Sequence, residues 1–441
     1  MTPRDTPATV WIRGASLAAL AAAARLGKAG HHVVLDCDGL PDGGHWAVRQ
    51  HLGVEVDELP QTFLLPAVWR DLFKKSGRAL DAELARHHLD LVPAPDQVHR
   101  FADGRTFCLP SERGAQFHAV DEAFGRRAAE AWCTLLDDLD DLWQRMRPVG
   151  LERPVGHDTF DRRTRAGLWS TLCLEDLAAR AGDPHLACIV RSQASLSGGV
   201  IAGRTPALVA VRLAVHRRFG SWQLVDEASR PVRASLLVEM LGERIDLRGV
   251  ERVGAPVALL GTGTPDLSRM QGPNPASAEV VLDTTAVQPV GFGGRKLVRP
   301  AYAPRITHEV IADDPEVIDP SIGIVEVQDH TAGTPVVSWH RPLPDGRTVV
   351  TTHDHTRPRP DLVWGLAPTS WKAWEHRPRL GGEGRWVASA GSHGGNEPWG
   401  ELLSAALAVY EIHEYLTDED IRPTNKQQPR LPRQARPASG V

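Results

Sequence analysis

The chain has 441 residues and a formal net charge of −5 at pH 7, since its 55 acidic residues outnumber its 50 lysines and arginines. A hydrophobic fraction of 42% and a charged fraction of 24% are those of a globular protein with a large apolar core. The negative charge argues against a nucleic-acid-binding surface, and no apolar run reaches the ~20 residues of an integral membrane segment. The five cysteines show no Cys-x-x-Cys spacing, so we expect free thiols and a cytoplasmic location.

The N-terminal region predicts the first βαβ unit of a dinucleotide-binding domain. The apolar residues 10–12 are typical of a short buried strand, which Gly14 ends. An alanine- and leucine-rich run to Leu26 predicts a helix, and residues 32–35 predict a second strand that finishes on Asp36. Because a domain of this kind is built on a parallel sheet covered by helices, the fold class that we expect is α/β.

The turn after the first strand is a variant of the G-x-G-x-x-G fingerprint, with Gly14, Ser16 and Ala19 at the three glycine positions. Gly14 keeps the tight turn, and Ala19 still permits close packing of helix and strand. Ser16 places a Cβ where a phosphate would lie, although its hydroxyl could donate a hydrogen bond to that phosphate beside the helix N-terminus. Asp36 follows Gly14 by 22 residues, the spacing expected of the acid that holds the ribose hydroxyls. The alternative is a βαβ unit that has kept its fold and lost its nucleotide.

The middle of the chain predicts a helical layer inserted between parts of the α/β domain. Residues 98–109 read as a strand, an Asp-Gly turn and a strand, which is a β-hairpin. Residues 120–146 and most of 168–219 have the apolar spacing of helices. The α/β domain then resumes with a strand, a helix over 233–241 and a further strand over 244–247.

The last third of the chain predicts an antiparallel sheet, because apolar and polar residues alternate over 299–352. Before it, residues 261–278 are mostly turn formers and predict an exposed loop. After it come a short strand over 386–390, a glycine-rich loop and a final helix over 402–416. The basic tail after Asp420 is rich in Pro and Gln and is predicted to be disordered.

Four stretches together resemble the phytoene desaturase-like members of the FAD-dependent amine oxidase superfamily. They are RGASLAALAAAARLGKAGHHVVLD at 13–36, LLPAVWRDLFKKSGRAL at 64–80, RFADGRTFCLP at 100–110 and AGSHGGNEPWGELLSAALAVYEI at 390–412. The last is similar to the family's G-[ST]-H-P-G-G segment, which closes the flavin site. The resemblance implies an FAD-binding Rossmann-like domain with an inserted substrate domain of antiparallel sheet and helices.

The resemblance also implies which residues hold FAD. The pyrophosphate would rest on the turn after the first strand, the ribose on Asp36 and the adenine against the backbone of Val250. The implied cofactor-binding residues are Gly14, Ala15, Ser16, Leu17, Asp36, Gly43, Gly44, His45, Val250, Gly391, Ser392, Gly394 and Gly395. His45 stands where the family has Arg or Lys, which removes a fixed positive charge near the phosphates, and Gly394 stands where it has proline.

Few residues outside the flavin site suggest chemistry. His393, in the segment that closes that site, is our candidate catalytic residue, and Trp399 in the same segment is a candidate for the substrate pocket. The alternative role of His393 is that of a loop histidine hydrogen-bonded to backbone. His353 and His355 alternate on a predicted strand and could face one metal ion, but the sequence places no third ligand. We therefore predict no metal site.

Together these features predict an FAD-dependent oxidoreductase, a desaturase, dehydrogenase or isomerase that transfers hydride from a hydrophobic or natural-product-like small molecule to the flavin. The alternative is a flavin-free member of the same fold that binds a protein partner or works without a cofactor. A nicotinamide-dependent dehydrogenase fits less well, because the C-terminal return to the nucleotide is a flavoprotein feature. The predicted parts are an FAD-binding domain at 1–85, 221–290 and 383–420, a substrate domain at 86–220 and 291–382, and a tail at 421–441.

Overall fold

The computed structural model describes residues 7–198, 201–254, 278–285, 297–312, 323–327, 329–330 and 332–423. The predicted loop over 261–278 and the predicted tail over 421–441 lie outside these residues, apart from 278 and 421–423. The elements in chain order are β1 (Thr9–Arg13), α1 (Leu17–Lys28), β2 (His32–Asp36), η1 (Gly44–Trp46), β3 (Arg49–His51), β4 (Val54–Val56), β5 (Phe63–Leu64), α2 (Ala67–Ser76), α3 (Leu80–Arg86), β6 (Leu89–Pro93), β7 (Gln97–Phe101), β8 (Thr106–Leu109), α4 (Arg113–Phe124), α5 (Arg126–Met146), α6 (Arg162–Gly167), α7 (Leu174–Ala178), α8 (Pro184–Leu196), η2 (Ala207–Ala210), α9 (Val211–Phe219), β9 (Ser221–Asp226), α10 (Leu236–Leu247), β10 (Glu251–Val253), β11 (Val280–Asp283), β12 (Arg299–Ala312), β13 (Gly323–Val327), β14 (Pro335–Pro342), β15 (Arg347–Ala367), α12 (Trp371–Glu375), β16 (Gly381–Gly382), β17 (Arg385–Val387) and α13 (Pro398–Thr417).

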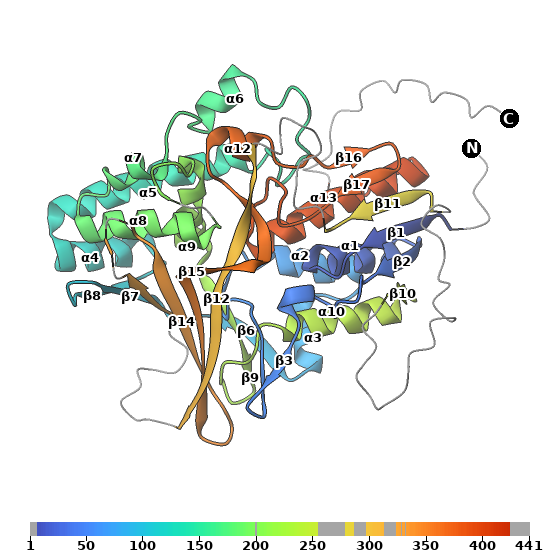
Figure 1. Cartoon of the computed structure of the whole chain (residues 1–441), viewed down its shortest axis with the longest axis horizontal. Helices are drawn as coiled ribbons and strands as arrows, with labels where there is room; N and C mark the ends of the chain where they lie inside the picture. The colour runs from blue at the N-terminus through green and yellow to red at the C-terminus, as the bar shows by residue number, and fades with distance from the viewer. Residues whose placement is uncertain are drawn as a thin grey trace.

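A mostly parallel sheet, on the right of Figure 1, contains six strands in the order β10–β2–β1–β11–β17–β16. Its neighbouring strands are parallel except for β16 and β17. Strand β1 is internal, and Val10 pairs with Val33 of β2 on one side and Val280 of β11 on the other. A strand with neighbours on both sides and helices above it is apolar along its length. The predicted α/β class is confirmed.

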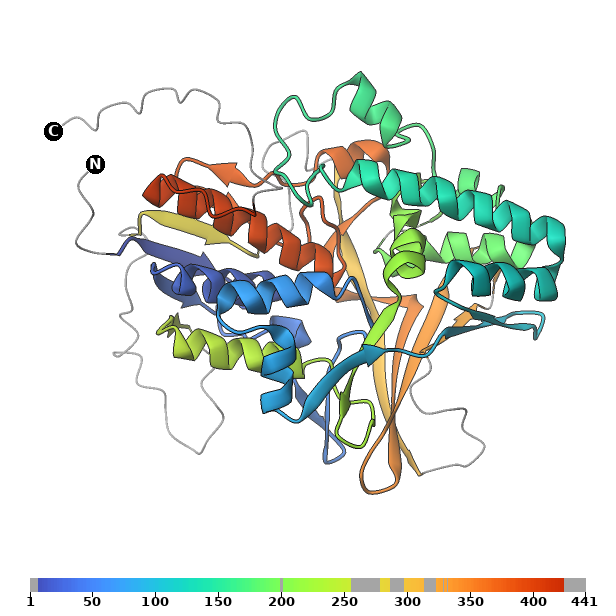
Figure 2. The ribbon, with the colours of Figure 1, turned by 180° about the vertical axis from the view of Figure 1, so that it is seen from behind.

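Helix α1 lies between this sheet and three other helices. Its residues 17–26 are all buried, and α13, α10 and α2 pack against it, as Figures 1 and 2 show from opposite sides. Alanine side chains make this possible because they let neighbouring helices approach closely. The N-terminus of α1 and the first turn of α13 meet, since Ala18 and Glu401 are hydrogen-bonded. Two ends of the chain thereby come together at the predicted nucleotide turn.

A second sheet forms the other half, with the strand order β12–β15–β14–β13–β7–β8. Strands β12 and β15, of 14 and 21 residues, are paired antiparallel with register shifts around residues 301–305. The β7–β8 hairpin joins this sheet through the parallel pairing of β7 with β13. Helices α4, α5, α7, α8 and α9 lie together on the left of Figure 1 and form a helical layer. The predicted hairpin, antiparallel sheet and helical layer are all present.

Two predictions for the middle of the chain are wrong. Residues 244–247, predicted as a strand, form the last turn of α10. The buried residues Leu237, Leu241 and Ile245 recur at helical spacing because α10 packs against α1. Strand β9, predicted to return the chain to the parallel sheet, instead pairs antiparallel with β5 and β6. The chain rejoins the parallel sheet only at β10, beside β2.

Most of the tryptophan side chains belong to the core. Trp69, Trp132 and Trp374 are among the largest side chains that the fold buries completely. Among the described helices, none combines the length and the apolar character needed to cross a membrane.

Candidate functional site

Gly14 makes the turn between β1 and α1 that a bound dinucleotide would need. Its φ is +104°, a backbone conformation that favours glycine. Its N–H donates to the backbone oxygen of Asp36 over 2.7 Å and so joins the carboxyl ends of β1 and β2. A Cβ on Gly14 would lie 2.6 Å from Oγ1 of Thr284 and 2.8 Å from Cγ2 of Thr285. The backbone angle and the contact with the end of β11 both restrict this position to glycine.

The first turn of α1 directs its free backbone N–H groups at side chains of the protein itself. Ser16 is the N-cap, and its Oγ accepts a hydrogen bond of 3.3 Å from the N–H of Ala19. Glu401, in the first turn of α13, accepts a bond of 3.0 Å from the N–H of Ala18 through Oε1. Burial raises the pKa of the Glu401 carboxyl, and hydrogen bonds from Ala18 and Ser16 counter part of that rise. A buried carboxyl group thus lies at the N-terminus of α1.

Asp36 and the Gly43–Gly44 pair lie around the same turn. Asp36 ends β2, so its carboxylate is at the edge of the sheet where ribose binds in dinucleotide folds. Gly43 has φ +84°, and a Cβ there would lie 2.6 Å from Cγ1 of Val238. A Cβ on Gly44 would lie 3.7 Å from the backbone oxygen of Ala15. The fold therefore brings together the predicted residues of the β1–α1 turn, the acid after β2 and the glycine pair.

An aromatic group formed by His45, Trp46 and Trp364 joins this turn to β15 of the second sheet. The ring centroids of His45 and Trp46 are 4.2 Å apart, and those of Trp46 and Trp364 are 5.2 Å apart. Burial lowers the pKa of His45 to about 4, so the imidazole is neutral at pH 7. The Trp46 indole lies close enough to Glu401 to lower the pKa of that carboxyl, although its Nε1 makes no hydrogen bond of regular geometry.

The adenine contact at Val250 stays a prediction, and the register of β10 offers Val253 as a second candidate. Val250 precedes β10 and is buried, and a Cβ on Gly27 near the end of α1 would lie 3.4 Å from its Cγ2. That places Val250 toward the amino ends of the strands, whereas dinucleotides bind at the carboxyl ends. Val253 is the residue that pairs with Asp36. Sequence patterns do not show the register of β10 against β2, which the folded sheet sets.

The glycine-rich loop before α13 is held tightly in place. A Cβ on Gly394 would lie 2.6 Å from the backbone oxygen of Gly400, so the two backbones are in contact. Ser392 Oγ accepts a bond of 2.8 Å from Ser404, and its backbone oxygen accepts one of 2.8 Å from the buried guanidinium of Arg377. The predicted residues of this loop are Gly391, Ser392, Gly394 and Gly395. All four lie directly before the helix turn that carries Glu401.

His393 is packed inside the protein and is only 3% exposed. A Cβ on Gly150 would lie 2.5 Å from the Cβ of His393, and the imidazole meets the Trp374 ring edge to face with centroids 5.2 Å apart. Its Nε2 is 3.4 Å from the backbone oxygen of Glu375, which is the kind of contact expected for its alternative, structural role. Burial lowers the pKa of His393 to about 3. Together with Trp399 it lines a cavity of about 50 Å³, so a contact with substrate stays a prediction for both residues.

A larger cavity of about 650 Å³ lies where β12 and β15 bend. Apolar groups such as Ala301 and Tyr302 line it, with Arg299 and His355 among its polar groups. Its volume is within the range of roughly 300–1,000 Å³ typical of small-molecule sites. A third cavity, of about 50 Å³, is lined by aromatic groups including Trp364. None of the three cavities is lined by residues 14–17, 36 or 43–45.

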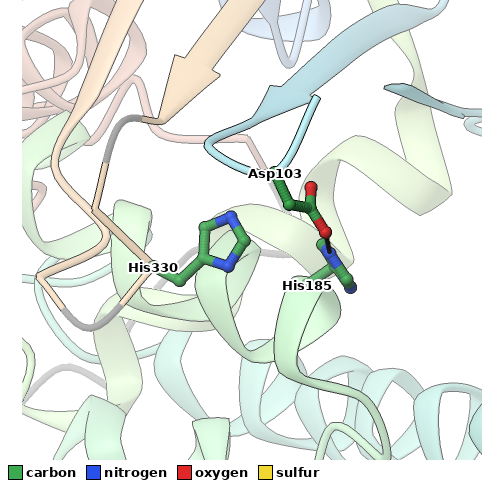
Figure 3. A group of neighbouring side chains, drawn as sticks. All are labelled: Asp103, His185 and His330. Carbon is green, nitrogen blue, oxygen red and sulfur yellow. Dashed lines mark hydrogen bonds and ion pairs between the residues drawn. The ribbon is translucent and has the colours of Figure 1, made fainter. Parts of the chain in front are cut away.

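Asp103 between β7 and β8, His185 of α8 and His330 between β13 and β14 lie close together (Figure 3). The Nε2 of His185 lies 2.8 Å from Asp103 Oδ2, and its Nδ1 lies 3.0 Å from Asp183 Oδ1. His330 accepts a bond of 3.1 Å from the N–H of Ala102. These contacts fasten the tip of the β7–β8 hairpin to the start of α8. His353 and His355, considered above as a metal pair, are not part of a cluster of three potential ligands among the described residues.

The sequence relatives that match the chain are desaturases by name. No family model matches the chain. It is 29% identical over 259 residues to the hydroxyneurosporene desaturase of Cereibacter sphaeroides. The aligned region covers 56% of this chain and 50% of the relative. It is 26% identical over 130 residues to the phytoene desaturase of Cercospora nicotianae. That aligned region covers 30% of this chain and 20% of the relative. Over these segments the chain is similar to desaturases of the phytoene desaturase kind. It spans half, or less, of the length of these curated relatives.

The chain shares its fold with solved oxidoreductases. An oxidoreductase from Methanosarcina mazei matches with a TM-score of 0.57 at 14% identity, over 90% of this chain and 99% of the other. Putrescine oxidase bound to putrescine matches with a TM-score of 0.58 at 13% identity, over 92% of this chain and 99% of the oxidase. A Rab GDI from Plasmodium falciparum matches with a TM-score of 0.50 at 9% identity, over 95% of this chain and 100% of the Rab GDI. The predicted Rossmann-like domain with a substrate domain is confirmed, while a fold shared with a Rab GDI does not by itself decide the chemistry.

The residues of the β1–α1 turn fit FAD only in part. Gly14 and Asp36 have the places that a dinucleotide requires. The position of the pyrophosphate, next to the N–H of Ala18, is filled by Glu401, so a diphosphate does not fit while that side chain is there. Sequence reasoning missed Glu401, although an acid directly after Gly400 in an otherwise apolar helix start was a visible signal.

Proposed function

We propose that the protein is an FAD-dependent oxidoreductase that acts on a hydrophobic small molecule, by desaturation, dehydrogenation or isomerisation. The relationship to phytoene and hydroxyneurosporene desaturases supports this class of substrate. The observation that carries the proposal is the meeting of α1 and α13 at the glycine turn. A last helix that returns to the first nucleotide-binding helix encloses a cofactor between them, as the resemblance to flavoproteins implies.

The cofactor residues of the proposal follow from the geometry at the carboxyl edge of the parallel sheet. The ribose would lie at Asp36, with Val253 beside it, and the pyrophosphate at the first turn of α1. The Gly43–Gly44 turn would lie alongside, against Ala15. This arrangement requires the Glu401 side chain to move out of the turn.

The substrate would bind in the cavity of about 650 Å³ between β12, β15 and the end of α8. Its apolar lining suits the body of a hydrophobic molecule, since burial of apolar surface drives binding at such sites. Arg299 and His355 supply polar groups that would orient one end of it. Hydrophobic and natural-product-like substrates are both compatible with this lining.

A second function is favoured by Glu401 itself. A carboxyl group that already satisfies the helix N-terminus allows the fold to persist without a nucleotide. In this case the protein would be a flavin-free binding protein, or an enzyme without a cofactor, that uses the same large cavity. A protein partner would then be expected in place of redox chemistry.

The test is the visible absorption spectrum of the purified full-length protein, recorded before and after incubation with FAD. Flavin bands that remain with the protein after gel filtration, and that bleach without oxygen on addition of a substrate such as phytoene, would support the oxidoreductase. Asp36→Asn should weaken FAD binding about fivefold, because a charged hydrogen-bond acceptor is lost. The neighbouring Asp38→Asn is the matched control and should leave it unchanged. Spectra without flavin bands in every sample would favour the flavin-free function.

A further inference from the structure

The N-terminus of α1 is built as an anion site. Helix N-termini present unpaired N–H groups and the positive end of the helix dipole, which is why phosphates bind there. In this chain the helix is 12 residues long, and it starts directly after the Gly14 turn. The Ser16 hydroxyl bonds the N–H of Ala19 and so leaves the N–H of Ala18 for another acceptor.

Glu401 is that acceptor. Its Oε1 lies 3.0 Å from the Ala18 nitrogen, and the residue is only 3% exposed. A carboxylate offers the same kind of oxygen to an N–H group as a phosphate does. The side chain therefore does at this turn what a pyrophosphate oxygen does in a nucleotide-bound protein of this fold.

The neutral His45 supplies no fixed positive charge that would compensate a diphosphate added beside Glu401. His45 stands where the resembling family has Arg or Lys, and its burial leaves it neutral. Among the described residues, Glu401 forms no ion pair with a lysine, arginine or histidine, and the polar groups around it are backbone N–H groups, the Ser16 hydroxyl and the Trp46 indole. Two like charges forced together in such a site repel each other strongly.

We propose that Glu401 is an internal occupant of the pyrophosphate position, so that FAD enters only when this side chain is displaced or removed. This inference rests on the proposed function, because it names what controls the access of its cofactor. Displacement exchanges the oxygen of one acidic group for that of another at the Ala18 N–H, so that the helix N-terminus is satisfied in both states. The carboxylate and the pyrophosphate therefore compete for one place.

The experiment compares full-length wild type with Glu401→Ala, Glu401→Gln and Glu411→Gln. Glu411 lies further along α13 and loses the same charge, so its variant is the matched control. FAD affinity is measured by quenching of flavin fluorescence. The melting temperature is measured with and without inorganic pyrophosphate, which tests the anion position without the rest of FAD.

We expect Glu401→Ala to bind FAD at least about tenfold more tightly than wild type, a change of about 1.4 kcal/mol. Glu401→Gln removes the charge but keeps the volume, so its affinity should lie between the two. Glu411→Gln should match wild type. Pyrophosphate should raise the melting temperature of Glu401→Ala and leave that of wild type unchanged.

The outcomes separate this inference from the proposed function. Equal, tight FAD binding by wild type and both Glu401 variants would overturn the inference and keep the oxidoreductase. Stabilisation of Glu401→Ala by pyrophosphate without any FAD binding would support the inference and remove the oxidoreductase. No difference between wild type and the Glu401 variants toward either ligand would overturn the inference. If Glu401→Ala does not fold, the FAD affinity of Glu401→Gln is compared with that of Glu411→Gln. Equal affinities of these two variants would overturn the inference.

Discussion

The Oε1 atom of Glu401 lies 3.0 Å from the backbone nitrogen of Ala18, a residue 383 positions earlier in the chain. This contact joins the first turns of the last and first helices of the Rossmann-like half. It fills the place that the glycine turn of a dinucleotide fold offers to a pyrophosphate. In the proposed function, access of FAD to this turn therefore depends on whether this carboxyl group stays in place.

The stability of the protein should depend on pH through Glu401. Burial raises its pKa in the folded state above the unfolded value, so the folded protein binds more protons in that interval and its stability falls as pH rises through it. Glu401→Gln lacks this titration. The melting temperature of Glu401→Gln relative to wild type should therefore increase between pH 4 and pH 7. Glu130→Gln, at an exposed position of α5, gives the baseline, and a constant difference for both variants would contradict the prediction.

Replacement of Gly14 should damage the turn more than replacement of another glycine with positive φ. Gly14→Ala combines backbone strain at φ +104° with a Cβ 2.6 Å from Thr284 Oγ1. We expect a loss of about 2–4 kcal/mol in the free energy of unfolding. Gly30→Ala, at φ +88° with no atom within 4 Å of the added Cβ, should lose only about 1 kcal/mol. Urea unfolding measures both, and equal losses would show that the contact with β11 is unimportant.

The buried ion pair of Glu83 and Arg244 should contribute strongly to stability. Their side chains are 4% and 6% exposed, and they join α3 to α10. Glu83→Ala leaves a buried guanidinium without its partner and should reduce the free energy of unfolding by about 3–5 kcal/mol. Glu227→Ala removes the exposed pair with His88 and should change it by less than about 1 kcal/mol. Thermal or urea unfolding of the two variants would contradict this if the losses were similar.

His393 should make the protein sensitive to acid. Burial lowers its pKa to about 3 from 6.5, so the unfolded chain takes up a proton below pH 6.5 that the folded protein does not bind. The stability that depends on neutral His393 is therefore lost as pH falls from 6.5 toward 3. The difference in unfolding free energy between wild type and His393→Asn should shrink from pH 7 to pH 5. His118→Asn, at an exposed histidine of α4, is the control variant and is measured at the same pH values.

Much of the fold could be predicted from local patterns. The β1–α1–β2 unit, the β7–β8 hairpin, the helical layer and the antiparallel sheet all follow from apolar spacing and turn residues within short stretches of chain. The special position of Gly14 was visible for the same reason, since a turn between strand and helix has a local signature. The end of α10 was misread because helix and strand compete over short apolar runs, and packing against α1 decided between them.

The state of the site was decided by the tertiary structure alone. The sequence by itself determined the glycine turn, the acid after β2 and the glycine-rich loop before the last helix, because each of these is a local feature of the backbone. Only the folded chain brought Glu401 to the Ala18 N–H and paired Val253 with Asp36. It also buried His393 in contact with Gly150. Such contacts join residues far apart in the sequence, and the packing of whole helices and the register of strands fix them. Local pattern therefore predicted a nucleotide turn, and long-range packing placed the protein's own carboxyl group in it.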